Sequence, residues 1–183
     1  MGKVYSEVTP QLQAWISRQH MFFVATAPLS ADHHVNCSPK GMDSFRILGP
    51  ASACYFDYTG SGAETIAHLR ENGRIVLMFC AFEGPPKIVR LHGRGSVVRP
   101  DDSAWETLSP LFSLPEQPRA FIKVDISRVS DSCGFGVPLM DFKSERDAFH
   151  KWNHGKSAKD LADYRRANNA KSLDNLPAWD EPN

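Results

Sequence analysis

Three basic or potentially basic side chains occupy every second position of one apolar stretch. Between Lys87 and Arg94, side chains alternate in direction along an extended strand, so Arg90, His92 and Arg94 share one face. Three such groups in a row are unfavourable inside a barrel, because buried charges need partners. The spacing therefore leaves two alternatives, an ordinary solvated face or a site for an acidic partner or a bound anion.

A glycine-rich turn upstream of that strand is the second candidate. The turn from Thr59 to Gly62 separates an apolar strand, 54–58, from a stretch with helical spacing, 63–71. Ser61 and Glu64 stand at the spacing of a capping box, which satisfies the free amides of a helix N-terminus. The alternative is that those amides bind an anion such as a phosphate. Because the turn and the basic strand belong to one supersecondary unit, both could reach one phosphate.

Other reaction classes lack their motifs. No Gly-Lys-Ser/Thr follows the turn, as a Walker loop requires, and the chain has no G-x-S-x-G elbow of a hydrolase. His33, His34 and Cys37 lack two further ligands at metal-binding spacing, so we expect no metal. His68 and His150 are expected to be packing or surface residues rather than catalytic bases.

Composition limits the class of protein. The 183 residues suit one compact domain with an appendage, and the apolar fraction of 42% suffices for a core. With 21 basic and 21 acidic residues, the chain has no net charge, so we expect neither a nucleic-acid nor a membrane partner. The four cysteines form no C-x-x-C pair and no stretch approaches the roughly 20 apolar residues of a membrane span. We therefore expect a cytoplasmic protein with reduced thiols.

Short apolar strands with intervening helices run through the first 130 residues. The predicted strands are 21–27, 34–38, 54–58, 74–79, 88–98 and 121–129, and the predicted helices are 10–19, 63–71 and 102–112. In the last strand, alternation places Ile126 and Arg128 on the same face. Six or so mostly antiparallel strands with peripheral helices predict a small barrel, because closure removes exposed strand edges.

The composition shifts near the C-terminus, where the chain becomes polar and rich in charge. We divide it into a barrel domain, residues 1–143, and a helical extension, residues 144–183. The extension is expected to form two short helices and a frayed end that pack across the domain or against a partner subunit. An interaction tail is the functional alternative.

Three sequence blocks, in this order, resemble the pyridoxamine 5'-phosphate oxidase-like, FMN-binding split-barrel family. They are Y-x-D-Y-T-G-S-G-A-E-T-I-A-H-L, N-G-R-I-V-L-M-F and R-L-H-G-R-G, and the resemblance covers residues 10–129. A later block, S-C-G-F-G-V-P at 132–138, resembles a subgroup distinct from the biosynthetic oxidase. The resemblance implies a mainly β fold, a six-stranded antiparallel split barrel of the FMN-binding type with peripheral helices. It also implies a homodimer with two FMN molecules in clefts at the interface.

The resemblance further implies which residues bind the cofactor, grouped by the part of FMN that each contacts. Those expected along the isoalloxazine ring are Asn36, Cys37, Ser38 and Lys40. Those expected at the ribityl chain are Tyr58 and Thr59. Those expected at the phosphate are Ser61, Gly62, Glu64 and Thr65, with charge supplied by Arg90 or Arg94. Those expected to approach the ring from the other subunit are Cys133 and Gly134.

Two departures separate the chain from the biosynthetic oxidase. That enzyme has adjacent basic residues at the helix start, where Glu64 and Thr65 stand here, and a carboxylate beside a phosphate costs affinity unless it is held. The C-terminal Trp and Arg that bind its substrate have no match in 132–141. Oxidation of pyridoxamine phosphate is therefore not expected.

The resemblance therefore implies an FMN-dependent oxidoreductase that acts on an undefined small-molecule substrate. It assigns no catalytic residue. The flavin would transfer the hydride while the protein positions it. Lys40, near the pyrimidine end of the ring, would stabilise negative charge on the reduced flavin. Two alternatives stay open, a non-catalytic barrel that binds flavin or haem and a dimeric interaction protein with an empty cleft. A deazaflavin or haem is the alternative ligand to FMN.

Overall fold

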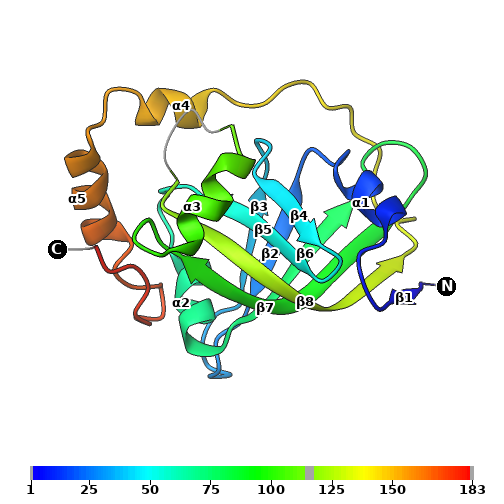
Figure 1. The fold of residues 1–183 in the computed structure, drawn as a ribbon, viewed down its shortest axis with the longest axis horizontal. Coiled ribbons are helices and arrows are strands. Elements are labelled where there is room, and N and C mark those ends of the chain that lie inside the picture. The colour runs from blue at the N-terminus through cyan, green and yellow to red at the C-terminus, as the bar shows by residue number, and fades with distance from the viewer. Residues whose placement is uncertain (1, 114–117, 182–183) are drawn as a thin grey trace.

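One strongly curved antiparallel sheet organises the protein (Figure 1). The computed structural model describes residues 2–113 and 118–181, and the statements below concern that part of the chain. The sheet has eight strands, with the spatial order β3-β2-β6-β7-β8-β5-β4 and with β1 paired to β8. The strands are β1 (Val4–Tyr5), β2 (Phe22–Thr26), β3 (Asn36–Lys40), β4 (Phe45–Gly49), β5 (Ser52–Asp57), β6 (Arg74–Cys80), β7 (Ile88–Val98) and β8 (Ala120–Ser132).

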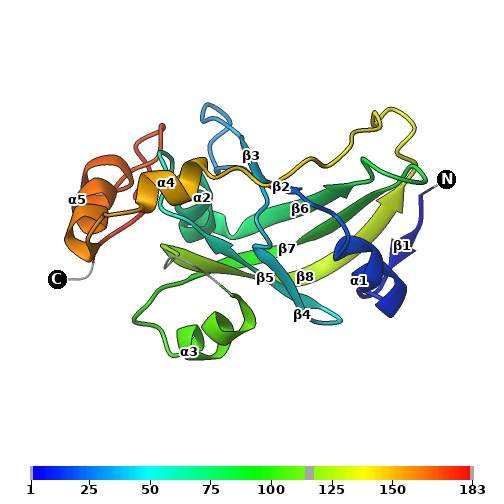
Figure 2. The same ribbon diagram turned by 90° about the horizontal axis from the view of Figure 1, so that it is seen from above.

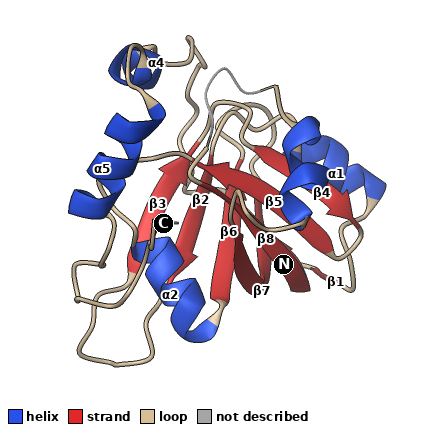
Figure 3. Cartoon of the chain, turned by 60° about the vertical axis from the view of Figure 1, so that its left-hand side comes forward, coloured by secondary structure: helices blue, strands red, loops and turns tan. Residues whose placement is uncertain are grey.

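Short helices surround this sheet. They are α1 (Pro10–Ile16), α2 (Glu64–Asn72), α3 (Ala104–Leu108), the 3₁₀ turn η1 (Ser109–Leu111), α4 (Ala148–Asn153) and α5 (Ala158–Asn168). The start of α1 follows from its sequence, because the Thr9 hydroxyl accepts a hydrogen bond from the Leu12 amide and Pro10 stands at the first helical position. Helices α2 and α5 lie beside β3, whereas α1 lies at the opposite end of the sheet (Figure 3).

Apolar side chains fill both faces of the sheet at β5. Ala53 and Tyr55 belong to the main core inside the curved sheet, whereas Cys54 and Phe56 belong to a second cluster with Leu108 of α3. Figure 2 shows α3 on the opposite side of β5 and β8 from α2. Burial on both faces explains why residues 53–56 are apolar without interruption rather than alternating with polar residues.

The predicted mainly β fold is confirmed as an antiparallel half-barrel with peripheral helices, but the predicted count of six strands is wrong. The two additional strands are β1, which has only two residues, and β4, whose residues are all partly buried. Neither produces the alternation that marks a half-buried strand. The helix predicted over 102–112 is also divided, into α3 and η1, where Pro110 cannot supply an amide hydrogen.

A bulge in β8 reverses the side-chain direction predicted for the end of that strand. His92 pairs with Arg128 while the next residue, Gly93, pairs with Ile126, so Ser127 is the extra residue. As a result Arg128 is exposed and Val129 is buried. The expectation that Arg128 shares the face of Ile126 is therefore wrong.

The C-terminal extension contains the two expected helices, α4 and α5, but residues 169–181 are not frayed. Ala178 and Trp179 are buried, and the Trp179 amide donates to the Asn169 carbonyl over 2.9 Å. The extension lies along one end of the sheet, far from the N-terminus (Figure 1). Among the described residues, no helix is both long and apolar enough to cross a membrane.

Candidate functional site

Polar side chains from three elements meet at the inner face of β3. Asn36 Nδ2 donates to Thr65 Oγ1 of α2 over 3.0 Å and to Thr26 Oγ1 of β2 over 3.2 Å. Thr26 Oγ1 in turn lies 2.9 Å from His68 Nδ1. The His68 side chain is fully buried, and burial lowers its pKa, so the imidazole is neutral at pH 7. These contacts fix the first turns of α2 against the edge strand β3.

A buried ion-pair network lies at the other end of β3. Lys40 Nζ donates to Asp57 Oδ1 over 2.9 Å, and Arg119 Nη2 donates to Asp57 Oδ2 over 2.5 Å. Arg119 Nη1 also donates to the carbonyl of Gly62 over 3.1 Å. Burial acts to raise the pKa of Asp57, but Arg119 and Lys40 outweigh it and hold the value at about 2. The carboxylate is therefore ionised and keeps the Lys40 ammonium in place.

The start of α2 differs from the predicted capping box. Ala63 is the N-cap residue and no side chain caps the helix, so Ser61 and Glu64 do not form the expected pair. Glu64 Oε1 instead accepts a hydrogen bond from the Leu173 amide over 3.3 Å. A Cβ atom on Gly62 would lie 2.3 Å from Glu64 Oε2, so this carboxylate lies against the glycine. A negative charge thus occupies the turn that was expected to bind phosphate.

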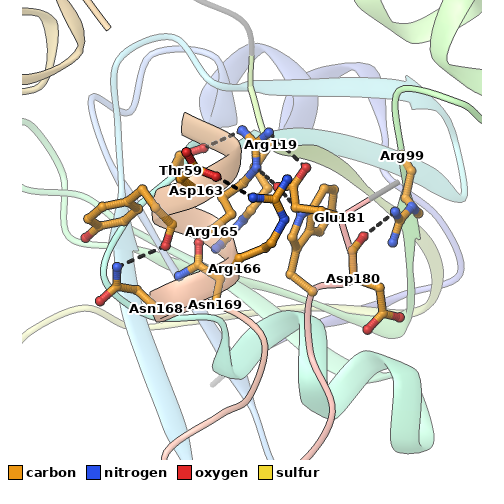
Figure 4. Close-up of polar contacts among 12 residues, drawn as sticks. Thr59, Arg99, Arg119, Asp163, Arg165, Arg166, Asn168, Asn169, Asp180 and Glu181 are labelled. Carbon is orange, nitrogen blue, oxygen red and sulfur yellow. Dashed lines mark hydrogen bonds and ion pairs between the residues drawn. The ribbon is translucent and has the colours of Figure 1, made fainter. Parts of the chain in front are cut away.

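The C-terminal extension contributes polar groups to the same turn (Figure 4). Arg165 Nη1 donates to Thr59 Oγ1 over 3.3 Å, and Asn169 Nδ2 donates to the Gly60 carbonyl over 2.9 Å. Asn169 Oδ1 is buried and, among the described residues, has no hydrogen-bond donor. The Arg165 guanidinium forms an ion pair with Glu181 through Nε and Nη2. Sequence reasoning missed these residues.

Most of the residues predicted to bind the ring, ribityl chain and phosphate lie together around this site. On β3, the partly buried Asn36, Ser38 and Lys40 alternate with the exposed Cys37, which therefore faces the other side of the strand. The Tyr58 ring packs on Phe149 of α4, with their centroids 4.1 Å apart. The remaining members of the predicted set at the turn are Thr59, Ser61, Gly62, Glu64 and Thr65.

The two predicted basic residues, Arg90 and Arg94, bind groups outside the turn. Arg94 Nη1 donates to the Asn72 carbonyl over 2.6 Å, at the C-terminal end of α2, and a nine-residue helix is about 13 Å long. Arg90 Nη1 donates to Ser132 Oγ over 3.0 Å, next to the predicted Cys133 and Gly134. Within one chain, these contacts hold Arg90 and Arg94 at residues other than those of the turn, and binding of one phosphate by all three stays a prediction.

Arg90 and Cys37 instead belong to the outer face of the sheet. The strand register places two rows of side chains on that face across β3, β2, β6, β7 and β8. The first row is Pro39, Phe23, Met78, Arg90 and Ser130. The second row is Cys37, Ala25, Val76, His92 and Arg128. The apolar members in the middle of these rows are only partly buried in the single chain.

Comparison with known proteins assigns the family. Residues 8–133 match the family model described as pyridoxamine 5'-phosphate oxidase. A relative, the pyridoxamine 5'-phosphate oxidase family protein ustO of Aspergillus flavus, is 39% identical over 190 aligned positions, which span 94% of this chain and 76% of that protein. The chain therefore belongs to the pyridoxamine 5'-phosphate oxidase family.

Solved structures share the fold at lower identity. A single-residue variant of HupZ from Group A Streptococcus has a TM-score of 0.57 at 21% identity, over 68% of this chain and 99% of that one. A putative pyridoxamine 5'-phosphate oxidase from Lactobacillus delbrueckii has a TM-score of 0.51 at 20% identity, over 68% and 94%. An FMN-binding protein from Syntrophomonas wolfei has a TM-score of 0.51 at 14% identity, over 70% and 85%. These likenesses establish the split-barrel fold.

Proposed function

We propose that the protein binds FMN at the site between β3 and the turn before α2, and that it is a flavin-dependent oxidoreductase acting on a small molecule. The observation that carries the proposal is that polar side chains line β3 from end to end, with Asn36 joined to Thr65 of α2 at one end and Lys40 joined to Asp57 of β5 at the other. The strand β3 is thus tied to two elements that follow it in the sequence, α2 and the end of β5, and the turn 58–63 connects these two. The FMN-binding protein of Syntrophomonas wolfei, which shares the fold, supports the choice of ligand.

The donor set fits a flavin nucleotide. Lys40 offers a cation for the ring, and Asp57 holds that cation in place. Asn169 Oδ1 is an acceptor without a donor among the described residues, and the ribityl chain carries hydroxyl donors. When bound, FMN supplies hydride transfer between a donor and an acceptor molecule. The protein's residues bind and orient the cofactor and keep a positive charge beside it.

We further propose that two chains form a homodimer through the outer face of the sheet. Its two rows of side chains have apolar centres, formed by Phe23, Met78, Ala25 and Val76, and polar residues toward β7 and β8. An apolar centre with a polar rim is typical of an interface. Dimerisation would also bury Arg90 and Cys37, which in the single chain lie on the opposite face of the sheet from Thr65.

The first test is an absorption spectrum of the purified protein, followed by heat release and mass determination of any chromophore. A flavin spectrum with released FMN supports the proposal. An intense Soret band would indicate haem and contradict it, and so would a colourless protein that does not bind added FMN. Oxidation of reduced nicotinamide by the FMN-loaded protein then separates an oxidoreductase from a non-catalytic flavin carrier.

A pair of threonine variants tests the location of the site. Thr65→Val removes a hydroxyl that accepts from Asn36 and that we assign to the phosphate. The substitution should raise the Kd for FMN about tenfold, because a hydrogen bond to a charged ligand would be lost. Thr107→Val changes an exposed threonine of α3 and should leave the Kd unchanged. Equal effects of the two variants would contradict a site at α2.

A further inference from the structure

The C-terminal extension follows the predicted cofactor site along its length. Its contacts occur in sequence order and reach the successive residues of the turn. They are Phe149 on Tyr58, Arg165 on Thr59, Asn169 on Gly60 and Leu173 on Glu64. Residues 144–181 thus lie beside the same stretch, 58–64, to which the ribityl chain and phosphate were assigned. The family model, which matches residues 8–133, does not reach this segment.

We propose that the extension forms one wall of the flavin cleft and that Arg165 is a phosphate-binding residue of the site. This inference rests on the proposed function and adds the source of the positive charge. Glu64 and Thr65 stand at the helix start, and neither side chain is basic, so neither can neutralise a phosphate. Arg165 is the guanidinium that the extension brings to the Thr59 hydroxyl. Arginine suits this role because its planar donor fork matches phosphate oxygens.

The extension is anchored firmly enough to serve as a wall. Trp179 is buried, with 3% of its surface exposed. Arg70 Nη1 donates to the Ala178 carbonyl over 2.6 Å and to Asp180 Oδ2 over 2.7 Å. Asp174 accepts from the His34 amide over 2.8 Å, which ties the extension to the β2–β3 loop. The segment is therefore part of the folded domain rather than a loose tail.

The contacts of Arg165 orient its guanidinium toward the turn. Glu181 accepts hydrogen bonds from Nε and Nη2, and Trp179 Nε1 donates to the same carboxylate over 2.8 Å. Burial acts to raise the pKa of Glu181, but the hydrogen bonds from Arg165 and Trp179 outweigh it, so the pKa is lowered. Glu181 therefore stays ionised and holds one edge of the guanidinium, which leaves Nη1 directed at Thr59.

The Arg165–Thr59 contact is a long hydrogen bond. Its length of 3.3 Å exceeds the roughly 2.9–3.0 Å that is most frequent for an N–H···O bond. A phosphate oxygen beside Thr59 would accept a shorter, charge-assisted bond from the same nitrogen. In the proposed complex, the Arg165–Glu181 pair stays in place and Nη1 turns from Thr59 to the phosphate.

The test compares FMN with riboflavin, which has the same ring and ribityl chain but no phosphate. Arg165→Met is paired with Arg166→Met, a neighbour on α5 whose side chain is 58% exposed and binds Asp163. Fluorescence titration should show that Arg165→Met raises the Kd for FMN about 10- to 100-fold and the Kd for riboflavin less than about twofold. Arg166→Met should change neither value by more than about twofold.

Three results would overturn the assignment of Arg165. They are an unchanged Kd for FMN in Arg165→Met, equal weakening of FMN and riboflavin, and equal effects of the Arg165 and Arg166 variants. The wild-type titrations separate this failure from that of the proposed function. If wild-type protein binds neither flavin, the proposed function fails and the inference fails with it; if it binds flavins, only the role of Arg165 is at issue.

Hydrogen exchange in the wild-type protein decides the question even if Arg165→Met does not fold. Saturating FMN should slow amide exchange in 158–181 more than saturating riboflavin does, because only FMN offers Arg165 a phosphate. Equal protection by the two flavins, or none in this segment, would show that the extension is not part of the phosphate site.

Discussion

Lys40 Nζ lies 2.9 Å from Asp57 Oδ1 and connects the edge strand β3 to β5 across the open side of the sheet. In the sheet order, these two strands are separated by β2, β6, β7 and β8, so no backbone ladder joins them directly. Asp57 also binds Arg119, which immediately precedes β8. The Asp57 carboxylate thus links the two sides of the half-barrel. It also fixes the position of Lys40, a cation of the proposed flavin site.

Removal of the Asp57 charge should destabilise the fold strongly. Asp57→Asn leaves the buried Arg119 without its counter-ion, and breaking a buried pair in this way costs about 3–5 kcal/mol. Asp125→Asn is the matched control, because Asp125 also lies next to a lysine on the sheet but its side chain is 72% exposed. Urea unfolding should show a loss of less than about 1 kcal/mol for the control. Similar losses in the two variants would contradict the role of the network.

The same carboxylate should make stability depend on pH in the acid range. Its folded-state pKa of about 2 lies below the ordinary value of 3.8, so its contribution is present above pH 4 and is lost as the pH falls toward 2. The difference between the two values corresponds to about 2 kcal/mol. The difference in unfolding free energy between wild type and Asp57→Asn should therefore shrink by about this amount between pH 5 and pH 2. A constant difference would show that Arg119 and Lys40 do not lower the pKa of Asp57.

Glu64 should oppose the binding of a phosphorylated flavin. Glu64→Gln removes a negative charge beside Gly62 while keeping an oxygen that can accept from the Leu173 amide. We expect the Kd for FMN to fall about fivefold, which corresponds to about 1 kcal/mol of relieved repulsion, with the Kd for riboflavin unchanged. Glu106→Gln, at an exposed position of α3, is the control for a change in net charge. Weaker FMN binding in Glu64→Gln would place the phosphate elsewhere.

The bulge between β7 and β8 should depend on a glycine. A Cβ atom on Gly93 would lie 2.2 Å from the Asp125 carbonyl oxygen, a backbone atom that cannot move aside cheaply. Gly93→Ala should therefore cost about 1–3 kcal/mol or more in unfolding free energy. A Cβ on Gly49, in strand β4, meets no atom within 4 Å, so Gly49→Ala should change stability by less than about 1 kcal/mol. Equal effects in thermal denaturation would contradict the predicted close approach.

The sequence predicted the fold well where a strand has one or two buried faces. β2, β5, β6 and β7 were located to within a few residues because their apolar residues form continuous or alternating runs. The edge strand β4 was missed, since its residues 45–49 are all partly buried and it ends at Gly49 beside Pro50. The bulge at Ser127 was missed because only the pairing with β7, thirty-odd residues away in sequence, reveals it.

The site was predicted in part, and the reason lies in sequence separation. Family resemblance located Asn36 and Thr65, which the structure brings together, and Lys40, which it places at the other end of β3 beside Asp57. Asp57 was visible as a lone acidic residue inside an apolar strand, a sign of a buried pair, but its partner Arg119 is 62 residues away. Arg165 lies 106 residues from Thr59, and no local spacing connects two such positions.

The most direct test of the central claim is isothermal titration calorimetry of the purified, flavin-free protein with FMN. The account predicts saturable binding of one FMN per chain, which is weakened by Thr65→Val and not by Thr107→Val. The absence of saturable binding, or binding that both variants leave intact, would contradict a flavin site between β3 and α2.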